Sequence, residues 1–135
     1  MMNIVFLQEA LWKQIWAYLR FCVRINHVGI AVGDNKFIHL SYGGVKISPI
    51  PDKRYKVMLR SFVTYAKTIT TIEQIKEAYI FGDFKNVKLD KLRLIFPFLP
   101  KKSDNTILCN EFVDDVALRY GGVIINSLQI AKEIV

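Results

Sequence analysis

One stretch, NHVGIAVGDNKFIHLSY at 26–42, constrains the fold more than any other part of this sequence. It contains both histidines of the chain, His27 and His39. Two runs in which apolar residues recur at every second position flank a Gly-Asp-Asn turn at 33–35. Alternation with a period of two, interrupted by such a turn, predicts a β-hairpin.

The register of this hairpin decides whether the two imidazoles lie close together. A three-residue loop would pair Val32 with Lys36 and place His39 opposite Gly29. Both histidines would then share one face as diagonal neighbours, with Cβ atoms roughly 7–8 Å apart. A two-residue loop would shift the pairing by one residue and place them on opposite faces. The first register gives a face of small residues, which suits a functional site better than a core.

Size and charge set the broad class. A chain of 135 residues has room for one domain with a genuine core, and we predict a single domain over 1–135. Hydrophobic residues make up 52% and charged residues 23%, which is typical of a globular protein. The net charge of +7 would favour an anionic partner such as nucleic acid, a phospholipid surface or an acidic substrate. A merely soluble basic surface is the favoured alternative, because the basic residues are scattered.

The amino-terminal segment predicts neither a signal peptide nor a membrane span, because Gln8, Glu9 and Lys13 interrupt its apolar residues. We therefore expect a cytoplasmic protein, with association at a membrane surface left open. The two cysteines, Cys22 and Cys109, fit neither a disulfide framework nor a zinc-binding pattern.

The whole pattern predicts an α+β protein in which an antiparallel sheet packs against helices. An apolar stripe in the helix expected at 8–22 contains Trp12, Trp16 and Cys22. Such a stripe could line a lipid or acyl groove, but burial against the sheet is the favoured interpretation, with Cys22 as a buried structural thiol. Besides the hairpin, strands are expected at 3–7, 45–48, 55–63 and 123–125, and helices at 8–22, 70–82, 89–96, 105–122 and 127–134.

The second informative stretch is NTILCNEFVDDVALRYGG at 105–122. Cys109 begins an apolar stripe with helical spacing, and Gly121 and Gly122 should end the helix. Cap candidates at 103–106 place Cys109 in or near the first turn. There the unpaired amides and the helix dipole would stabilise a thiolate and lower the pKa of Cys109. From these residues alone, an inert cysteine on a core stripe is the commoner alternative.

HVGIAVGDNKFIHL, followed far downstream by ILCNEFVDDVAL, resembles the circularly permuted, papain-like NlpC superfamily. The most similar branch is the YiiX-like proteins, with a His-Val-Gly-Ile strand and a Cys-Ser-Glu-Phe/Leu-Val helix. Relatives of lecithin:retinol acyltransferase share the plan, including two histidines twelve residues apart (39 − 27 = 12). The chain departs from these patterns at Asn110, which replaces Ser or Glu, and at His39, which stands where YiiX-like proteins often have a carboxylate.

The resemblance implies a permuted papain-like fold, with the His-bearing hairpin before the Cys-bearing helix. It also implies a thiol hydrolase (an amidase, peptidase or lipid esterase) or an acyltransferase. Cys109 would be the nucleophile that forms a thioester, His27 the base and His39 the residue that orients His27. The backbone N–H of Cys109 would supply half of an oxyanion hole, and no metal or cofactor would be needed. Cys109 and His27 should then lie in side-chain contact.

Two other classes of function stay open. A catalytically silent binding module of the same fold is one, although the presence of both His27 and Cys109 counts against it. A basic nucleic-acid-binding domain ranks last, because no helix-turn-helix, zinc finger or aromatic RNA-binding signature is found. The expected partners are an acyl, amide or peptide substrate and an anionic membrane surface, with nucleic acid not expected. The substrate, the acyl acceptor and the oligomeric state are left open.

Overall fold

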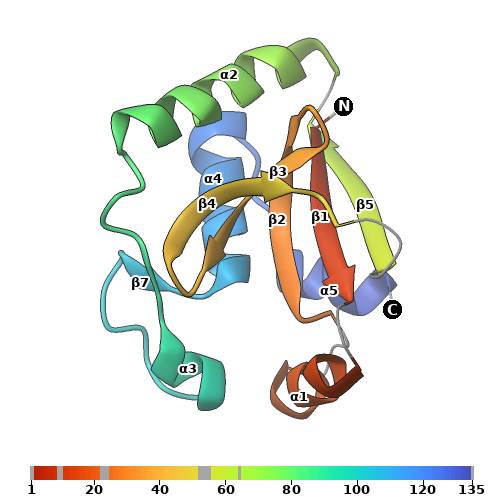
Figure 1. Cartoon of the computed structure of the whole chain (residues 1–135), viewed down its shortest axis with the longest axis vertical. Helices are drawn as coiled ribbons and strands as arrows, with labels where there is room; N and C mark the ends of the chain where they lie inside the picture. Colours follow the sequence, from red (N-terminus) through yellow and green to blue (C-terminus); the bar gives the residue numbers. More distant parts are fainter. Residues whose placement is uncertain (1, 9–10, 22–24, 52–55, 64, 135) are drawn as a thin grey trace.

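The computed structural model in Figure 1 describes all residues except 1, 9–10, 22–24, 52–55, 64 and 135. The described chain is an α+β structure, as predicted. Its main sheet is antiparallel and five-stranded, in the order β4-β3-β2-β1-β5, and β6 and β7 form a small parallel pair. The strands are β1 (Met2–Gln8), β2 (His27–Gly33), β3 (Lys36–Ser41), β4 (Gly44–Pro49), β5 (Lys56–Val63), β6 (Lys88–Leu89) and β7 (Thr106–Ile107).

Helices lie beside this sheet and at both ends of the molecule. Figure 1 shows α2 at one end and α1 with α3 at the other, while α4 runs beside β2 and β3. The helices are α1 (Leu11–Phe21), α2 (Tyr65–Phe81), α3 (Lys91–Ile95), α4 (Cys109–Gly121) and α5 (Ser127–Ile134).

The turn between β2 and β3 differs from the predicted three-residue loop. Asp34 and Asn35 have φ angles of +54° and +56°, which is the pattern of a two-residue type I′ turn. Gly33 therefore pairs with Lys36, and the predicted pairing of Val32 with Lys36 is wrong. Asn and Asp tolerate the left-handed conformation better than other residues that carry a side chain, which explains the tighter turn.

A β-bulge restores the register that the two-residue turn would otherwise have shifted. The pairing slips between Ala31 and Gly33, so that β2 contains one more residue than β3 over this stretch. Gly29 consequently pairs with His39. The predicted position of His39 is confirmed, although a turn and a bulge together produce it.

The main core fills the space between one face of the sheet and the helices. Alternate residues of β1, β2 and β3 meet the apolar stripe of α4, whose predicted burial is confirmed. Gly122, with a φ of +64°, ends α4 as expected. A smaller cluster on the opposite face contains Val5, Leu7 and Phe37. The largest contributors to the main core are Ile4, Phe6, Ile30, Ile38, Leu40, Phe112 and Val113.

The predicted burial of the α1 stripe is wrong for the residues described. Trp12 is 68% exposed, Trp16 is 50% exposed and Leu19 is 71% exposed, whereas Ala17 is buried. The helix lies beyond the ends of the strands rather than over a face of the sheet (Figure 1), so few of its positions meet the core. Cys22 lies outside the described residues, and its structural role stays a prediction.

Other predicted elements have different bounds or do not form. Helix α2 begins at Tyr65 instead of Thr70. The helical spacing at 89–96 is divided between β6 and α3, because the carboxylate of Asp90 accepts a hydrogen bond from the Arg93 N–H at 3.1 Å and starts a new helix. No strand forms at 123–125, where the chain crosses from α4 to α5.

Candidate active site

The two histidines contact one another across the β2–β3 hairpin. His27 Nε2 lies 2.7 Å from His39 Nδ1, and the two rings are nearly perpendicular, at 88°. The predicted placement of both imidazoles on one face is confirmed. Because one ring nitrogen must donate while the other accepts, this bond fixes the orientation of His27 and couples its tautomer to that of His39.

Ser48 on β4 extends the histidine pair. His39 Nε2 lies 2.9 Å from the Ser48 Oγ, so both ring nitrogens of His39 have polar partners. Since β4 pairs Lys46 with His39, the residue two positions further along, Ser48, lies diagonally on the same face. The sequence interpretation missed this residue, although the alternation of β4 would have indicated it once β4 was aligned with β3.

Phe37 and Gly29 shape the space around the imidazoles. The Phe37 ring stacks on His39 with centroids 4.4 Å apart and an interplanar angle of 12°. The Phe37 and His27 rings are nearly perpendicular, at 79°, with centroids 6.2 Å apart. A Cβ atom at Gly29 would collide with the Phe37 ring and lie 2.6 Å from the Ile38 carbonyl oxygen. The absence of a side chain at Gly29 therefore allows Phe37 to hold both imidazoles in place.

Cys109 is the first residue of α4, and its predicted place in the first turn is confirmed. The expected cap at 103–106 is wrong, because Thr106 belongs to β7 and Leu108 occupies the N-cap position. The carboxylate of Glu111 accepts a hydrogen bond from the Leu108 N–H at 2.9 Å. A residue within the helix, and not one before it, satisfies this amide.

Arg93 of α3 holds Glu111 in this position. Its Nη1 lies 2.6 Å from Glu111 Oε1, and its Nη2 lies 3.3 Å from Oε2. Both side chains are largely buried, at 13% and 26% exposed. A paired contact between guanidinium and carboxylate fixes geometry better than a single bond does. It ties α3 to the end of α4 at which Cys109 lies.

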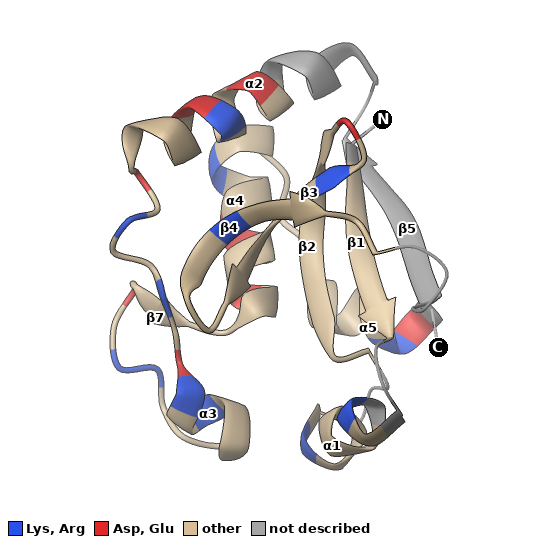
Figure 2. Ribbon diagram, viewed as in Figure 1, with Lys and Arg blue, Asp and Glu red and all other residues tan. Residues whose placement is uncertain are grey.

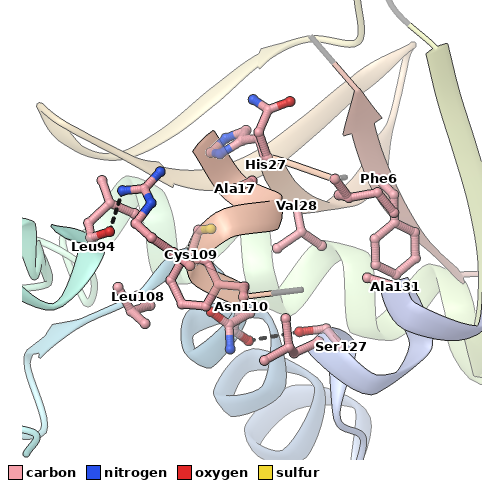
Figure 3. Close-up of a pocket in the computed structure, with 15 residues that line it drawn as sticks. Phe6, Ala17, His27, Val28, Leu94, Leu108, Cys109, Asn110, Ser127 and Ala131 are labelled. Carbon is pink, nitrogen blue, oxygen red and sulfur yellow. Dashed lines mark hydrogen bonds between the residues drawn. The ribbon is translucent and has the colours of Figure 1, made fainter. Parts of the chain in front are cut away.

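Ser127 fixes α5 beside the same helix. Its hydroxyl donates to the Asn110 carbonyl oxygen at 3.0 Å, and its N–H donates to Asp114 Oδ1 at 2.9 Å. Burial raises the pKa of Asp114, while the hydrogen bonds from Ser127 oppose that rise. Ser127 and Asn110 both line the cavity described next, so these bonds position one of its walls (Figure 3).

His27 and Cys109, 82 residues apart in sequence (109 − 27 = 82), line one cavity of about 70 Å³ (Figure 3). A hydrogen bond from the Val28 backbone reaches the Cys109 thiol, so this thiol meets β2 next to His27. The predicted contact between the His27 and Cys109 side chains stays a prediction. The remaining walls are mainly apolar and include Phe6, Phe21, Ile25, Leu108 and Leu128.

The predicted lowering of the Cys109 pKa is wrong. Burial raises the pKa of this thiol to about 11, and the carboxylate of Glu111 adds to the rise. The backbone N–H groups of Val28, Asn110 and Cys109 act in the opposite direction. The amides at the start of the helix do favour a thiolate, but the apolar cavity disfavours its charge by more.

No family model, curated protein or solved structure matches the chain. Within the part of the chain that the structure describes, no group of three or more His, Cys, Asp or Glu side chains is arranged to hold a metal ion.

Proposed function

We propose that the protein is a cysteine-dependent hydrolase or acyltransferase that acts on an amide or ester bond. Cys109 is the nucleophile, His27 is the general base and His39 is a positioning residue that orients His27. The main support is that Cys109, at the first position of α4, lines the same cavity as His27. The imidazole of His27 is held by a 2.7 Å hydrogen bond to that of His39. Nucleophile, base and orienting group are the parts that such chemistry needs.

The raised pKa of Cys109 decides how the nucleophile would be activated. With a pKa of about 11, roughly one thiol in 10⁴ is ionised at pH 7. A stable thiolate–imidazolium pair is therefore not the resting state in this proposal. The thiol proton passes to His27 as the sulfur attacks the acyl carbon. Because the Nε2 of His27 faces His39, the proton is taken up at Nδ1.

The next steps return this proton and release the product. The attack forms a carbon–sulfur bond and places negative charge on the carbonyl oxygen. The N–H groups of Cys109 and Asn110, both close to the sulfur, are the donors we assign to that charge. The intermediate collapses to a thioester as the leaving amine or alcohol takes the proton from His27. Water or another hydroxyl or amine, deprotonated by His27, then attacks the thioester and releases Cys109 as a thiol.

A permuted papain-like fold of the NlpC type is part of this proposal. The order of the elements supports it, because the His-bearing β2–β3 hairpin belongs to an antiparallel sheet and precedes α4. Cys109 begins that helix, as the nucleophile of the resembled proteins does. Neither histidine could take its present role if the hairpin had the register without the bulge, since the two rings would then lie on opposite faces.

Turnover of defined substrates tests this function. Wild-type protein is assayed with p-nitrophenyl esters, peptide p-nitroanilides and acyl thioesters, next to Cys109→Ala and His27→Ala. We expect hydrolysis of at least one class, no turnover by Cys109→Ala, and a loss of roughly 10²–10⁴-fold in His27→Ala. Circular dichroism of each variant checks that the fold is kept. Equal turnover by folded Cys109→Ala would overturn the proposal.

The pKa of Cys109 favours one second candidate, a catalytically silent binding module whose thiol stays protonated. Alkylation by iodoacetamide distinguishes the two. If His27 accepts the thiol proton, His27→Ala should slow the alkylation of Cys109 near neutral pH. In a silent module the rate would be the same in both proteins, and it would rise only as the pH approaches the pKa of the thiol.

A further inference from the structure

Helix α1 presents an apolar face that no described element covers. Trp12, Ile15, Trp16 and Leu19 recur at helical spacing, and each is at least half exposed. Soluble proteins rarely leave a contiguous patch of large apolar side chains open to water without a function for it. A binding partner for this face is therefore the natural explanation of its composition.

Helix α3 and the turn after it add a second group of exposed apolar side chains at the same end of the molecule. Figure 1 shows α1 and α3 there, far from α2. Arg20 of α1 joins the two helices, because its guanidinium donates to the Leu94 carbonyl oxygen and lies 4.7 Å from the centre of the Trp16 ring. We define the docking face as Trp12, Ile15, Trp16 and Leu19 with Leu92, Ile95, Phe96 and Phe98.

The docking face lies next to the candidate active site. Ala17, Arg20 and Phe21, on the α1 side, and Leu94 of α3 line the cavity that also contains His27 and Cys109. The same two helices thus contribute outward-facing residues to the docking face and inward-facing residues to the cavity wall. A molecule bound at the docking face would lie within reach of the cavity.

The charges around the docking face select the kind of partner. Helices α1 and α3 each contain two basic residues, and the described part of neither contains an acidic one, whereas α2 and α4 carry several acidic residues (Figure 2). A hollow of about 550 Å³ beside α3 is lined by Lys85, Lys88, Lys91 and Lys102, all exposed. Asp90, the acidic residue that lines this hollow, is buried as the cap of α3, and Asp104 lies 3.7 Å from the Lys101 ammonium.

We propose that α1 and α3 form an interfacial docking face for bilayers that contain anionic phospholipid. Tryptophan side chains favour the headgroup region, leucine and phenylalanine enter the acyl boundary, and lysines attract anionic headgroups. A protein partner fits less well, because lysine is depleted in protein–protein interfaces. None of the described helices is long and apolar enough to cross a bilayer. That a membrane lipid supplies the acyl group to Cys109 follows only if the proposed function holds.

Vesicle binding tests the docking face without any need for catalysis. The chain has two tryptophans, both on α1, so their fluorescence reports on this helix alone. Protein is mixed with vesicles of phosphatidylcholine, with or without phosphatidylserine, and is then sedimented. We expect a blue shift and sedimentation with the phosphatidylserine vesicles, weaker binding without phosphatidylserine, and further weakening at high salt.

Matched variants show whether the named residues bind the vesicles. The double variant Trp12→Ser/Leu19→Ser should lower vesicle affinity by about tenfold or more. Ile80→Ser is the control, because Ile80 is 77% exposed on α2 at the other end of the molecule and should have no effect. Cys109→Ala should bind as wild type does, so failure of the proposed function and failure of docking are distinguishable.

Three results would overturn the docking proposal. The first is that the wild-type protein does not sediment with phosphatidylserine vesicles. The second is that the double variant binds the vesicles as tightly as the wild-type protein does. The third is that the wild-type protein binds equally well with and without phosphatidylserine. Light scattering adds a fourth. If the wild-type chain is a stable dimer and Trp12→Ser/Leu19→Ser is a monomer, a second copy covers the face and the lipid proposal is wrong.

Discussion

The surroundings of Cys109 keep its thiol protonated. His27, the base that we assign to it, is hydrogen-bonded to the imidazole of His39. Burial raises the pKa of Cys109 to about 11, and His39 lies 2.7 Å from His27 on the side that we assign away from the sulfur. In the proposed mechanism the rate therefore depends on proton transfer within the site, and not on a pre-formed thiolate.

A graded series at His39 tests its positioning role. His39→Ala should slow turnover by roughly 10²–10⁴-fold, because His27 loses the bond that fixes its ring. His39→Gln keeps a hydrogen-bonding end and should retain more activity. Ser48→Ala removes one bond to His39 and should cost roughly two- to tenfold in kcat. These losses should appear in kcat with little change in KM, measured by steady-state kinetics.

Ser41→Ala is the control for Ser48→Ala, since the Ser41 hydroxyl donates to the Gly44 carbonyl oxygen and is not the group that bonds His39 Nε2. Its kcat should equal that of the wild-type protein. Near-normal turnover of His39→Ala on a substrate that still requires Cys109 would show that His39 only packs against the sheet.

The pKa of Cys109 also predicts an alkaline loss of stability. The pKa of the thiol is 9.0 in the unfolded chain and about 11 in the folded protein. Because the pKa is higher in the folded protein, the protonated thiol contributes fully to the free energy of unfolding below about pH 8. That contribution is lost as the pH rises through 11. Between about pH 9 and 11 the wild-type protein should lose about 2 kcal/mol more stability than Cys109→Ala does. Urea unfolding of both proteins across this range measures the difference, and parallel curves would contradict the burial of the thiol.

At the scale of elements, two local devices hold the site together. The β2–β3 hairpin joins a two-residue turn to a bulge, which places both histidines on one face. The start of α4 is fixed by Glu111, which accepts the Leu108 N–H and is held in turn by Arg93 of α3. Either device, if lost, should change the site while most of the core remains.

Gly29→Ala tests the close approach within the hairpin. Its new Cβ would meet the Phe37 ring and the Ile38 carbonyl oxygen, and only the ring can move. We expect a loss of about 1–3 kcal/mol in the free energy of unfolding, together with lower turnover, because Phe37 stacks on His39. Chemical denaturation and the ester assay measure the two effects.

Gly43→Ala is the matched control for this substitution. A Cβ at Gly43 would meet only the flexible end of Lys46, which can move aside at little cost. Its stability and turnover should stay close to those of the wild-type protein. A Gly29→Ala variant that behaved like Gly43→Ala would contradict the tight packing described for Phe37.

Glu111→Ala tests the anchoring of α4. The substitution leaves the Leu108 N–H without its carboxylate and a largely buried Arg93 without its partner. We expect a loss of about 2–4 kcal/mol in the free energy of unfolding. Asp115→Ala is the control, because the exposed contact between Asp115 and Arg119 should contribute only about 0.3–0.5 kcal/mol. Thermal or urea unfolding compares the two, and similar losses would show that Glu111 is not an anchor.

At the scale of the whole molecule, periodicity in the sequence predicts well which residues share a face of an element. It predicts poorly which distant elements pack against one another. The alternation around His27 and His39 predicts a common face, and the apolar spacing after Cys109 predicts the buried stripe of α4. The same spacing in α1 predicts an apolar face but not what covers it, and Trp12 proves to be exposed. Periodicity shows which residues share a side, while the end of the sheet at which a helix packs depends on contacts far along the chain.

The candidate site likewise contains residues that local patterns predict and residues that become evident only when distant elements are placed together. Cys109 and the histidines can be found from sequence because each lies in a recognisable local pattern. Ser48 becomes visible only when β4 is aligned with β3, and Arg93 only when α3 is placed against α4. The direction of the Cys109 pKa shift depends on the apolar cavity, whose walls come from several distant elements. Helix position alone gives the opposite sign.

Capture of the acyl-enzyme on Cys109 tests most directly whether this thiol is the nucleophile. Protein is incubated with a p-nitrophenyl ester, quenched in acid and analysed by intact-mass and peptide mass spectrometry. We expect a burst of p-nitrophenol and the mass of one acyl group on the peptide that contains Cys109, which hydroxylamine should release as it releases a thioester. Cys109→Ala should show neither, and His27→Ala should acylate more slowly. Turnover without an adduct on Cys109, or an adduct that forms equally fast without His27, would show that Cys109 and His27 do not have the roles proposed for them.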